Sequence, residues 1–362
     1  MFYHFLYPLR DFFFGFNVFR YITFRAAMAS ITAFIVSLLI GPLVIRFLHQ
    51  LELKQTIQRA GFSKLYKAHE GKDKVPTMGG LLILGALVIS TILWADLANR
   101  YVLSCLLVVI WLGAVGFVDD YLKFLKKDAK GLKVAAKFFG QISLSVGLGL
   151  FLYFDSNFWQ EIHVPFLKNF VLTVGPFYIL FVVLVVTGAS NAVNLTDGLD
   201  GLAIGCTAMI ALTYGLLSYV TGNAKISFYL QIPFVPGAGE LTVFCLALFG
   251  AGMGFLWFNS HPASVFMGDT GSLSIGGALG TVALFTKKEL LLLIIGGVFV
   301  VEALSVMIQV ASYKSRQKRV FLMAPIHHHF QLKGFPESKV VIRFWIVSLI
   351  LALVGLASLK LQ

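Results

Sequence analysis

Residues 101–123 read YVLSCLLVVIWLGAVGFVDDYLK, in which an uncharged apolar run, residues 101–118, is followed by two adjacent aspartates. The 18 residues before Asp119 have the length of a membrane-spanning helix, which takes about 17–25 mostly apolar residues. Lipid offers no hydrogen-bond partner to the backbone, so such a run must satisfy its own amides as a helix. A barrel strand would instead alternate polar and apolar residues over about 9–11 positions. The stretch therefore predicts a membrane helix with paired carboxylates at one end.

Nine further apolar runs lie on either side of this one in the 362-residue chain. Hydrophobic residues make up 58% of the sequence and charged residues only 13%, against about 25% charged residues in soluble proteins. We therefore predict an all-α, polytopic integral membrane helix bundle, folded as a single domain over residues 1–362. Ten membrane-spanning helices are expected, at residues 22–48, 78–98, 101–118, 137–154, 171–190, 201–221, 240–258, 271–286, 289–312 and 341–361.

The aromatic N-terminus, residues 1–21, lacks the basic start and small-residue cleavage site of a signal peptide. We expect it to lie in the membrane interface. The three cysteines, Cys105, Cys206 and Cys245, fall inside apolar runs without ligand-like spacing, which predicts buried thiols rather than a disulfide framework or a zinc site.

Basic residues divide unequally between the two faces that ten spans create. Twenty of the 29 Lys and Arg residues fall within residues 46–76, 119–137 and 314–343, which all lie on one face. The positive-inside rule makes that face cytoplasmic and both termini periplasmic. The basic residues behind the net charge of +12 thus chiefly orient the protein in the membrane, and some of them can bind anionic lipid headgroups. The chain has no soluble module for nucleic acid, so we expect no nucleic-acid partner.

Five aspartates share this basic face, although the topology rule does not require them there. Asp119 and Asp120 are adjacent and repel each other unless a cation or a proton lies between them. In SNAVNLTDGLDGL, residues 190–202, Asn194, Asp197 and Asp200 recur every third residue after Asn191 and would form one polar stripe on a helix. Ionisable groups at membrane depth are expensive and usually functional.

The fifth aspartate, Asp269, stands between Gly268 and Gly271, where a helix is predicted to begin. Glycines allow close approach of a ligand, and free amides at a helix N-terminus suit phosphate oxygens. Carboxylates that hold a hard cation, beside lysines that hold anions, are the groups needed for phosphoryl transfer, and Mg²⁺ is the predicted metal. A Walker loop is absent. The candidate phosphate-contacting residues on this face include Lys72, Thr77, Lys123, Lys133 and Lys137.

Three consecutive histidines lie in MAPIHHHFQLKGFPE, residues 323–337. Neighbouring residues on a helix point about 100° apart, so His327 and His329 could converge on zinc only in an extended segment. Contact of His327, His328 and His329 with a phosphate or a base, zinc binding, and simple solvent exposure remain open here. Glu302 and Gln309 are seven residues apart and are expected on one interior face, with Gln309 near the cytoplasmic end.

Five segments closely resemble the phospho-N-acetylmuramoyl-pentapeptide-transferase family of the polyprenyl-phosphate N-acetylhexosamine-1-phosphate transferases. They occur in the family's order and cover nearly the whole chain: PTMGG (76–80), DDYLK (119–123), NAVNLTDGLDGL (191–202), FMGDTGSL (266–273) and APIHHHFQLKGFPE (324–337). The triple-histidine segment distinguishes this branch from the related polyprenyl-phosphate GlcNAc-1-phosphate transferases, which share the aspartate motifs.

The resemblance implies transfer of phospho-MurNAc-pentapeptide from UDP-MurNAc-pentapeptide to undecaprenyl phosphate, which gives lipid I and UMP with Mg²⁺ as cofactor. It assigns Asp269 to the metal and Asp119 and Asp120 to a catalytic pair. It implies that Phe266 stacks on uracil and that Lys72, Asn259 and Asp200 line the nucleoside pocket. Other active-site positions by resemblance are Asn194, Asp197, Lys123, Lys137, His327, His328 and Gln309. We further expect His327 to be catalytic and Thr77 and His329 to contact substrate.

The expected catalytic loops lie on the cytoplasmic face, at residues 49–77, 119–137, 190–200, 259–270 and 313–340. The family implies a homodimer in the bacterial inner membrane. Two alternative functions stay open from the residues: a polyprenyl-phosphate GlcNAc-1-phosphate transferase and an ion-coupled transporter. A transporter would place its charged groups near the bilayer midplane, within repeated broken helices, whereas the five aspartates gather at one face.

Overall fold

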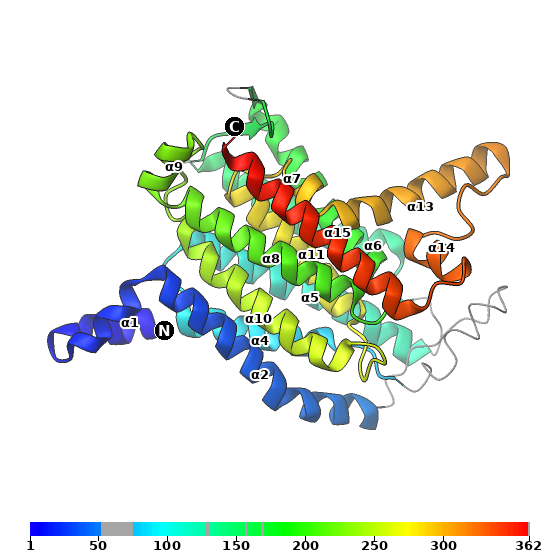
Figure 1. The fold of residues 1–362 in the computed structure, drawn as a ribbon, viewed down its shortest axis with the longest axis horizontal. Coiled ribbons are helices and arrows are strands. Elements are labelled where there is room, and N and C mark those ends of the chain that lie inside the picture. Colours follow the sequence, from blue (N-terminus) through cyan, green and yellow to red (C-terminus); the bar gives the residue numbers. More distant parts are fainter. Residues whose placement is uncertain (52–74, 127–130, 156–157, 168–169, 361–362) are drawn as a thin grey trace.

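The computed structural model describes residues 1–51, 75–126, 131–155, 158–167 and 170–360, and its long helices pack side by side in one bundle (Figure 1). The long helices are α2 (Ile22–Gln50), α4 (Gly80–Trp94), α5 (Arg100–Lys126), α6 (Val134–Phe154), α7 (Tyr178–Thr196), α8 (Leu202–Thr221), α10 (Leu241–Asn259), α11 (Gly268–Phe285), α13 (Gly297–Arg316) and α15 (Glu337–Ala357). Each of the ten predicted spans overlaps one of them. The prediction of an all-α, polytopic membrane bundle is confirmed.

Within the described residues, eight helices are long and apolar enough to cross a membrane. The other two are α4, which has only 15 residues, and α11, whose first half is rich in glycine and serine. Three predicted boundaries were wrong. The run 78–98 stops being helical at Trp94, the run 171–190 begins as a strand, and the run 289–312 is broken at Gly296 between two helices.

Short helices and two strands precede, connect or follow the long helices. They are α1 (Phe2–Leu6), η1 (Tyr7–Asp11), η2 (Phe14–Arg20), η4 (Gly175–Phe177), α9 (Ala224–Leu230), η5 (Ala238–Glu240), α12 (Leu292–Ile295), α14 (Ile326–Leu332) and η6 (Ser358–Lys360). Strands β1 (Glu161–His163) and β2 (Val171–Thr173) pair antiparallel, with Ile162 opposite Leu172. Figure 1 places both chain ends toward the left of the view and α14 at the right, so the termini lie at the end of the bundle away from α14.

Helix α11 forms the centre of the bundle, and every residue from Thr270 to Phe285 is buried. It packs mainly against α5 and α7. Gly116 of α5 allows the closest approach, because a Cβ at this position would lie 2.2 Å from the backbone oxygen of Asp269. The first turn of α11 is therefore held against the end of α5 that carries Asp119 and Asp120.

Candidate active site

Three carboxylates meet where the end of α5 touches the start of α11. Asp119, Asp120 and Asp269 each offer one oxygen, and these oxygens all lie within 4.8 Å of one another. Asp119 and Asp120 are each only 3% exposed. Three anionic groups taken out of water at this spacing require positive charge among them.

Two lysines supply that charge. Lys123, one turn after Asp119 on α5, places its Nζ 2.6 Å from Asp119 Oδ2 and 2.8 Å from Asp269 Oδ2. Lys137, at the start of α6, places its Nζ 2.8 Å from the same Asp269 oxygen. The predicted gathering of Lys123 and Lys137 with the aspartates is therefore present, and three helices contribute to it.

Asp120 binds the N-terminus of α11. Its Oδ1 accepts a hydrogen bond from the Asp269 amide at 3.2 Å, and its Oδ2 accepts from the amide and the hydroxyl of Thr270 at 3.0 and 2.8 Å. A carboxylate there satisfies amides that have no partner within the helix and complements the helix dipole. Asp120 thus fixes Asp269 in place.

Gly268 brings a third segment into the site. Its φ of +73° is in the left-handed region that favours glycine, and an added Cβ would lie 2.7 Å from Asp120 Oδ2 and 3.0 Å from Thr77 Oγ1. The backbone of the 75–80 segment pairs with this region, since the amides of Gly79 and Gly80 donate to the carbonyls of Phe266 and Met267. Thr77 and Phe266, both half-buried, are held beside the acid cluster by these bonds.

Asp197 lies just past the end of α7, where the Gly268 amide donates to it. Removal of its carboxyl from water, together with the negative charges of Asp269 and Asp120, raises the pKa of Asp197 to about 7. The predicted polar stripe from Asn191 to Asp200 was wrong beyond Asn194, because α7 ends at Thr196. Asn194 remains on the last turn of α7, half-buried.

Asp200 belongs to a second polar group with His261 and Glu337. Asp200 Oδ2 lies 3.0 Å from His261 Nδ1 and accepts from the Ala263 amide, while Glu337 Oε1 accepts from the Asp200 amide. Asn259 is built into the neighbouring turn, where its amide group donates to Val265 O and its Oδ1 accepts from the Gly201 amide. These contacts position the loop that leads to Phe266.

The three histidines form a helix, α14, rather than the extended segment that joint zinc binding would need. His327 is fully buried, with Nδ1 3.1 Å from Glu302 Oε2, and an added Cβ on Gly198 would lie 2.3 Å from its Nε2. His328 pairs with Gln331, and His329 accepts from the Leu322 amide. The three rings therefore have separate partners.

Glu302 faces the interior as predicted, whereas Gln309 bonds the loop backbone at residues 320–321. The Gln309 side chain accepts from the amides of Val320 and Phe321 and donates to Phe321 O, so it holds the loop before α14. Within the described residues, the hydrogen bonds of Gln309 and His329 go to the loop before α14 and not to the three clustered aspartates. Lys72 lies outside the described residues.

Sequence reasoning missed Thr270, His261 and Glu337. Thr270 directly follows Asp269, and its hydroxyl contact with Asp120 depends on how two distant helices meet. His261 and Glu337 both stand in polar segments at helix ends, but the separation of 76 residues between them hid their common neighbour, Asp200. A search for every acid or imidazole within a few residues of a predicted helix end would have found both.

The site combines oxygen donors for a hard cation with two ammonium groups. Such a set can bind a polyphosphate and stabilise charge that moves between its oxygens.

Sequence comparisons agree with this chemistry. The family described as Glycosyl transferase family 4 matches residues 102–287, which include most of α5 and all of α7 and α11. Curated proteins named phospho-N-acetylmuramoyl-pentapeptide-transferase from Citrifermentans bemidjiense, Geobacter sp. (strain M21) and Pelobacter propionicus are each 55% identical over 362 residues, with full coverage of both chains. The chain therefore belongs to the phospho-N-acetylmuramoyl-pentapeptide-transferase family, within Glycosyl transferase family 4.

Proposed function

We propose that this protein transfers phospho-MurNAc-pentapeptide from UDP-MurNAc-pentapeptide to undecaprenyl phosphate, which yields undecaprenyl-PP-MurNAc-pentapeptide (lipid I) and UMP. This is the first membrane step of peptidoglycan synthesis. The observation that carries the proposal is the 55% identity to transferases of that name over the entire chain. The acid and lysine cluster supports it independently, because it supplies groups that phosphoryl transfer requires.

The acid cluster fits a divalent metal. Three carboxylates within 4.8 Å form an all-oxygen donor set, and Lys123 Nζ already occupies cation-binding distance from two of them. Oxygen donors without thiolate or paired imidazole favour Mg²⁺ over zinc. Asp269, with Asp119 and Asp120 beside it, is the proposed ligand, and bound Mg²⁺ would neutralise the pyrophosphate and the leaving UMP.

In the proposed reaction, a phosphate oxygen of undecaprenyl phosphate attacks the β-phosphorus of the UDP-sugar, and the bond from that phosphorus to the bridging oxygen of UMP breaks. Lys123 and Lys137 would hold the phosphates. Asp119 or Asp120 would accept the proton. Both oxygens of Asp120 accept hydrogen bonds from α11, while Asp119 accepts one from the Leu132 amide and pairs with Lys123. An already anionic phosphate needs little activation, which favours direct attack over a phosphoryl-aspartate intermediate.

The nucleoside half is proposed to lie along the loop between α10 and α11. Phe266 would stack on uracil, with Asn259, Asp200 and Lys72 around it. Asn194, Asp197, Thr77 and the α14 histidines would complete the substrate contacts, with His327 as a catalytic candidate. Asn259 and Asp200 also hold local backbone, so their removal would disturb the loop as well as any ligand contact.

We place the protein in the bacterial inner membrane with the acid cluster facing the cytoplasm, because the basic loops are on that side and the nucleotide substrate is cytoplasmic. The long apolar helices support a multi-pass arrangement with the bilayer as solvent. Ten crossings, periplasmic termini and a homodimer are part of the same proposal.

Purified protein should release UMP from UDP-MurNAc-pentapeptide when undecaprenyl phosphate and Mg²⁺ are present. Release from UDP-GlcNAc instead would favour the sister GlcNAc-1-phosphate transferases. A radiolabelled phospho-sugar that stays on the protein in the absence of lipid would replace direct attack by the two-step route. Absence of Mg²⁺-dependent UMP from either donor would refute the transferase assignment.

A further inference from the structure

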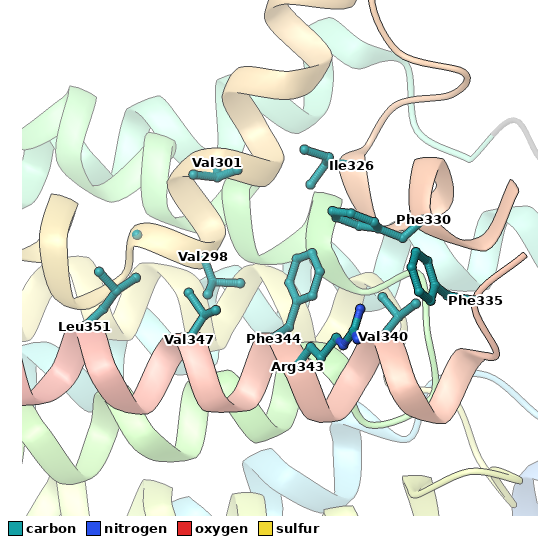
Figure 2. A pocket seen from close by; sticks show the side chains of 11 residues that line it. Val298, Val301, Ile326, Phe330, Phe335, Val340, Arg343, Phe344, Val347 and Leu351 are labelled. Atoms are coloured by element: carbon teal, nitrogen blue, oxygen red, sulfur yellow. The ribbon is translucent and has the colours of Figure 1, made fainter. Parts of the chain in front are cut away.

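A lateral cavity of about 320 Å³ lies between α13, α14 and α15, apart from the acid cluster (Figure 2). Ten of its eleven lining residues are apolar, and they include Val301 of α13, Phe330 of α14 and Val347 of α15. Val301 is 49% exposed and Val347 is 47% exposed, although both belong to helices long and apolar enough to span a membrane. The cavity therefore opens toward the hydrocarbon of the bilayer.

One charged side chain lines this apolar space. Figure 2 shows Arg343 extending from α15 beside Val340 toward Phe335, and its guanidinium carbon lies 4.9 Å from the centre of the Phe335 ring. Lys339, one turn earlier on α15, has its Nζ 5.6 Å from the same ring. Arg343 and Lys339 thus stand on one face of α15 at the rim of the cavity.

These two cations have no carboxylate partner within salt-bridge distance in the part of the chain that the structure describes. The nearby acid, Glu337, accepts a hydrogen bond from the Asp200 amide through its Oε1. The rim is therefore a positively charged surface beside a cavity that accepts hydrocarbon.

We propose that this cavity binds an anionic glycerophospholipid of the membrane, with one acyl chain in the cavity and the phosphate against Arg343 and Lys339. An arginine fork and a lysine recognise a phosphate well, and a basic pocket between membrane helices is a typical site for an anionic headgroup. The volume is at the low end for a ligand pocket, so it suits one chain rather than a whole lipid.

Charge and position select this occupant over the other lipids of the membrane. A zwitterionic lipid gains less from the positive charges of Lys339 and Arg343, because its own headgroup carries a cation. A polyprenyl phosphate bound here would have its phosphate on Arg343. Transfer requires the phosphate at the acid cluster, where the contacts come from Lys123, Lys137 and the start of α11. The bound lipid would instead brace α13, whose far half projects from the bundle in Figure 1, against α15.

Native mass spectrometry of the full-length protein in detergent, titrated with dioleoylphosphatidylglycerol, tests the proposal. The double variant Lys339→Gln/Arg343→Gln should bind this lipid about thirtyfold more weakly, at about fivefold per cation removed. Val347→Phe, which fills the cavity but keeps both cations, should also weaken binding. The matched control Arg316→Gln/Lys318→Gln loses the same charge at exposed positions outside the cavity lining and should bind like wild type.

Dioleoylphosphatidylcholine should bind weakly to the wild type and to all three variants. The KM of the Lys339→Gln/Arg343→Gln variant for undecaprenyl phosphate should stay within about twofold of the wild-type value, because neither side chain contacts the acid cluster. Equal loss in the control pair, or equal binding of the two phospholipids, would overturn the proposal. A KM for undecaprenyl phosphate that rises in parallel with the loss of phosphatidylglycerol would assign the cavity to the carrier lipid instead. Failure of the transferase assignment would leave the lipid titration unaffected.

Discussion

Single residues at the acid cluster divide into those that can meet a ligand and those that hold the site together. One oxygen of Asp269 contacts two lysines, while both oxygens of Asp120 accept hydrogen bonds from the first residues of α11. Gly268 belongs to the second class, because its backbone conformation and the space around its Cα both exclude a side chain. This division predicts different consequences for different substitutions.

Gly268→Ala should lower kcat/KM at least about tenfold. The new methyl group would push Asp120 and Thr77 apart, in addition to strain of about 1–2 kcal/mol from the positive φ. Gly175→Ala is the control, because Gly175 also has a positive φ, +52°, but nothing lies within 4 Å of its Cβ position. If both variants lose activity equally, backbone strain alone explains the effect and the close contact is unimportant.

Metal affinity should rise between about pH 6 and pH 8 and then level off. Asp197 has a pKa of about 7, so at pH 6 most molecules carry its proton and present one negative charge fewer to the metal. Titration with Mn²⁺ at pH 6, 7 and 8 measures this. Asp197→Asn should flatten the profile, and an unchanged profile in that variant would show that another group titrates.

The sequence predicted Asp119, Asp120, Asp269, Lys123 and Lys137 as neighbours, because sorting charges by membrane face places them at the same helix ends. It could not predict the partners of Thr270 or Glu337. Those contacts depend on the rotation and depth of helices that are far apart in sequence. The predicted polar stripe from Asn191 to Asp200 was too long, because residue spacing alone does not show that α7 ends at Thr196.

At the level of helices, the apolar run lengths were sufficient to locate all ten, because length and the lack of charge are what lipid demands. They did not reveal that α11 is buried from Thr270 to its last residue, Phe285. Its glycines and serines make it less apolar than its neighbours, yet they permit the close packing that burial requires. Nor did they show the break at Gly296 that separates α12 from α13.

Gly116→Ala should separate α5 from α11 and cost about 1–3 kcal/mol, because the added Cβ would lie 2.2 Å from Asp269 O. Thermal unfolding in detergent measures the loss, and UMP release should fall with it. Gly85→Ala is the matched control within α4, where nothing lies within 4 Å and alanine favours the helix. Equal melting temperatures for the two variants would contradict the proposed close packing.

Across the whole molecule, the proposed membrane orientation rests on the unequal charge of the two faces. Lys225 at the start of α9 and Ser315 near the end of α13 are both exposed, and the three native cysteines are buried. In intact spheroplasts, an impermeant maleimide should therefore label Lys225→Cys and should label Ser315→Cys only after permeabilisation. The reverse pattern would place the acid cluster outside the cell.

The central claim is that Asp269 holds the metal on which transfer depends. The most direct test is Mg²⁺-dependent UMP release by Asp269→Asn, which keeps the size of the side chain and removes its charge, beside Asp11→Asn as an exposed control. We predict that Asp269→Asn folds with a melting temperature near that of wild type and loses at least about 10²-fold in kcat, while the control is unaffected. Near-wild-type turnover by folded Asp269→Asn at the same Mg²⁺ concentration would contradict the claim.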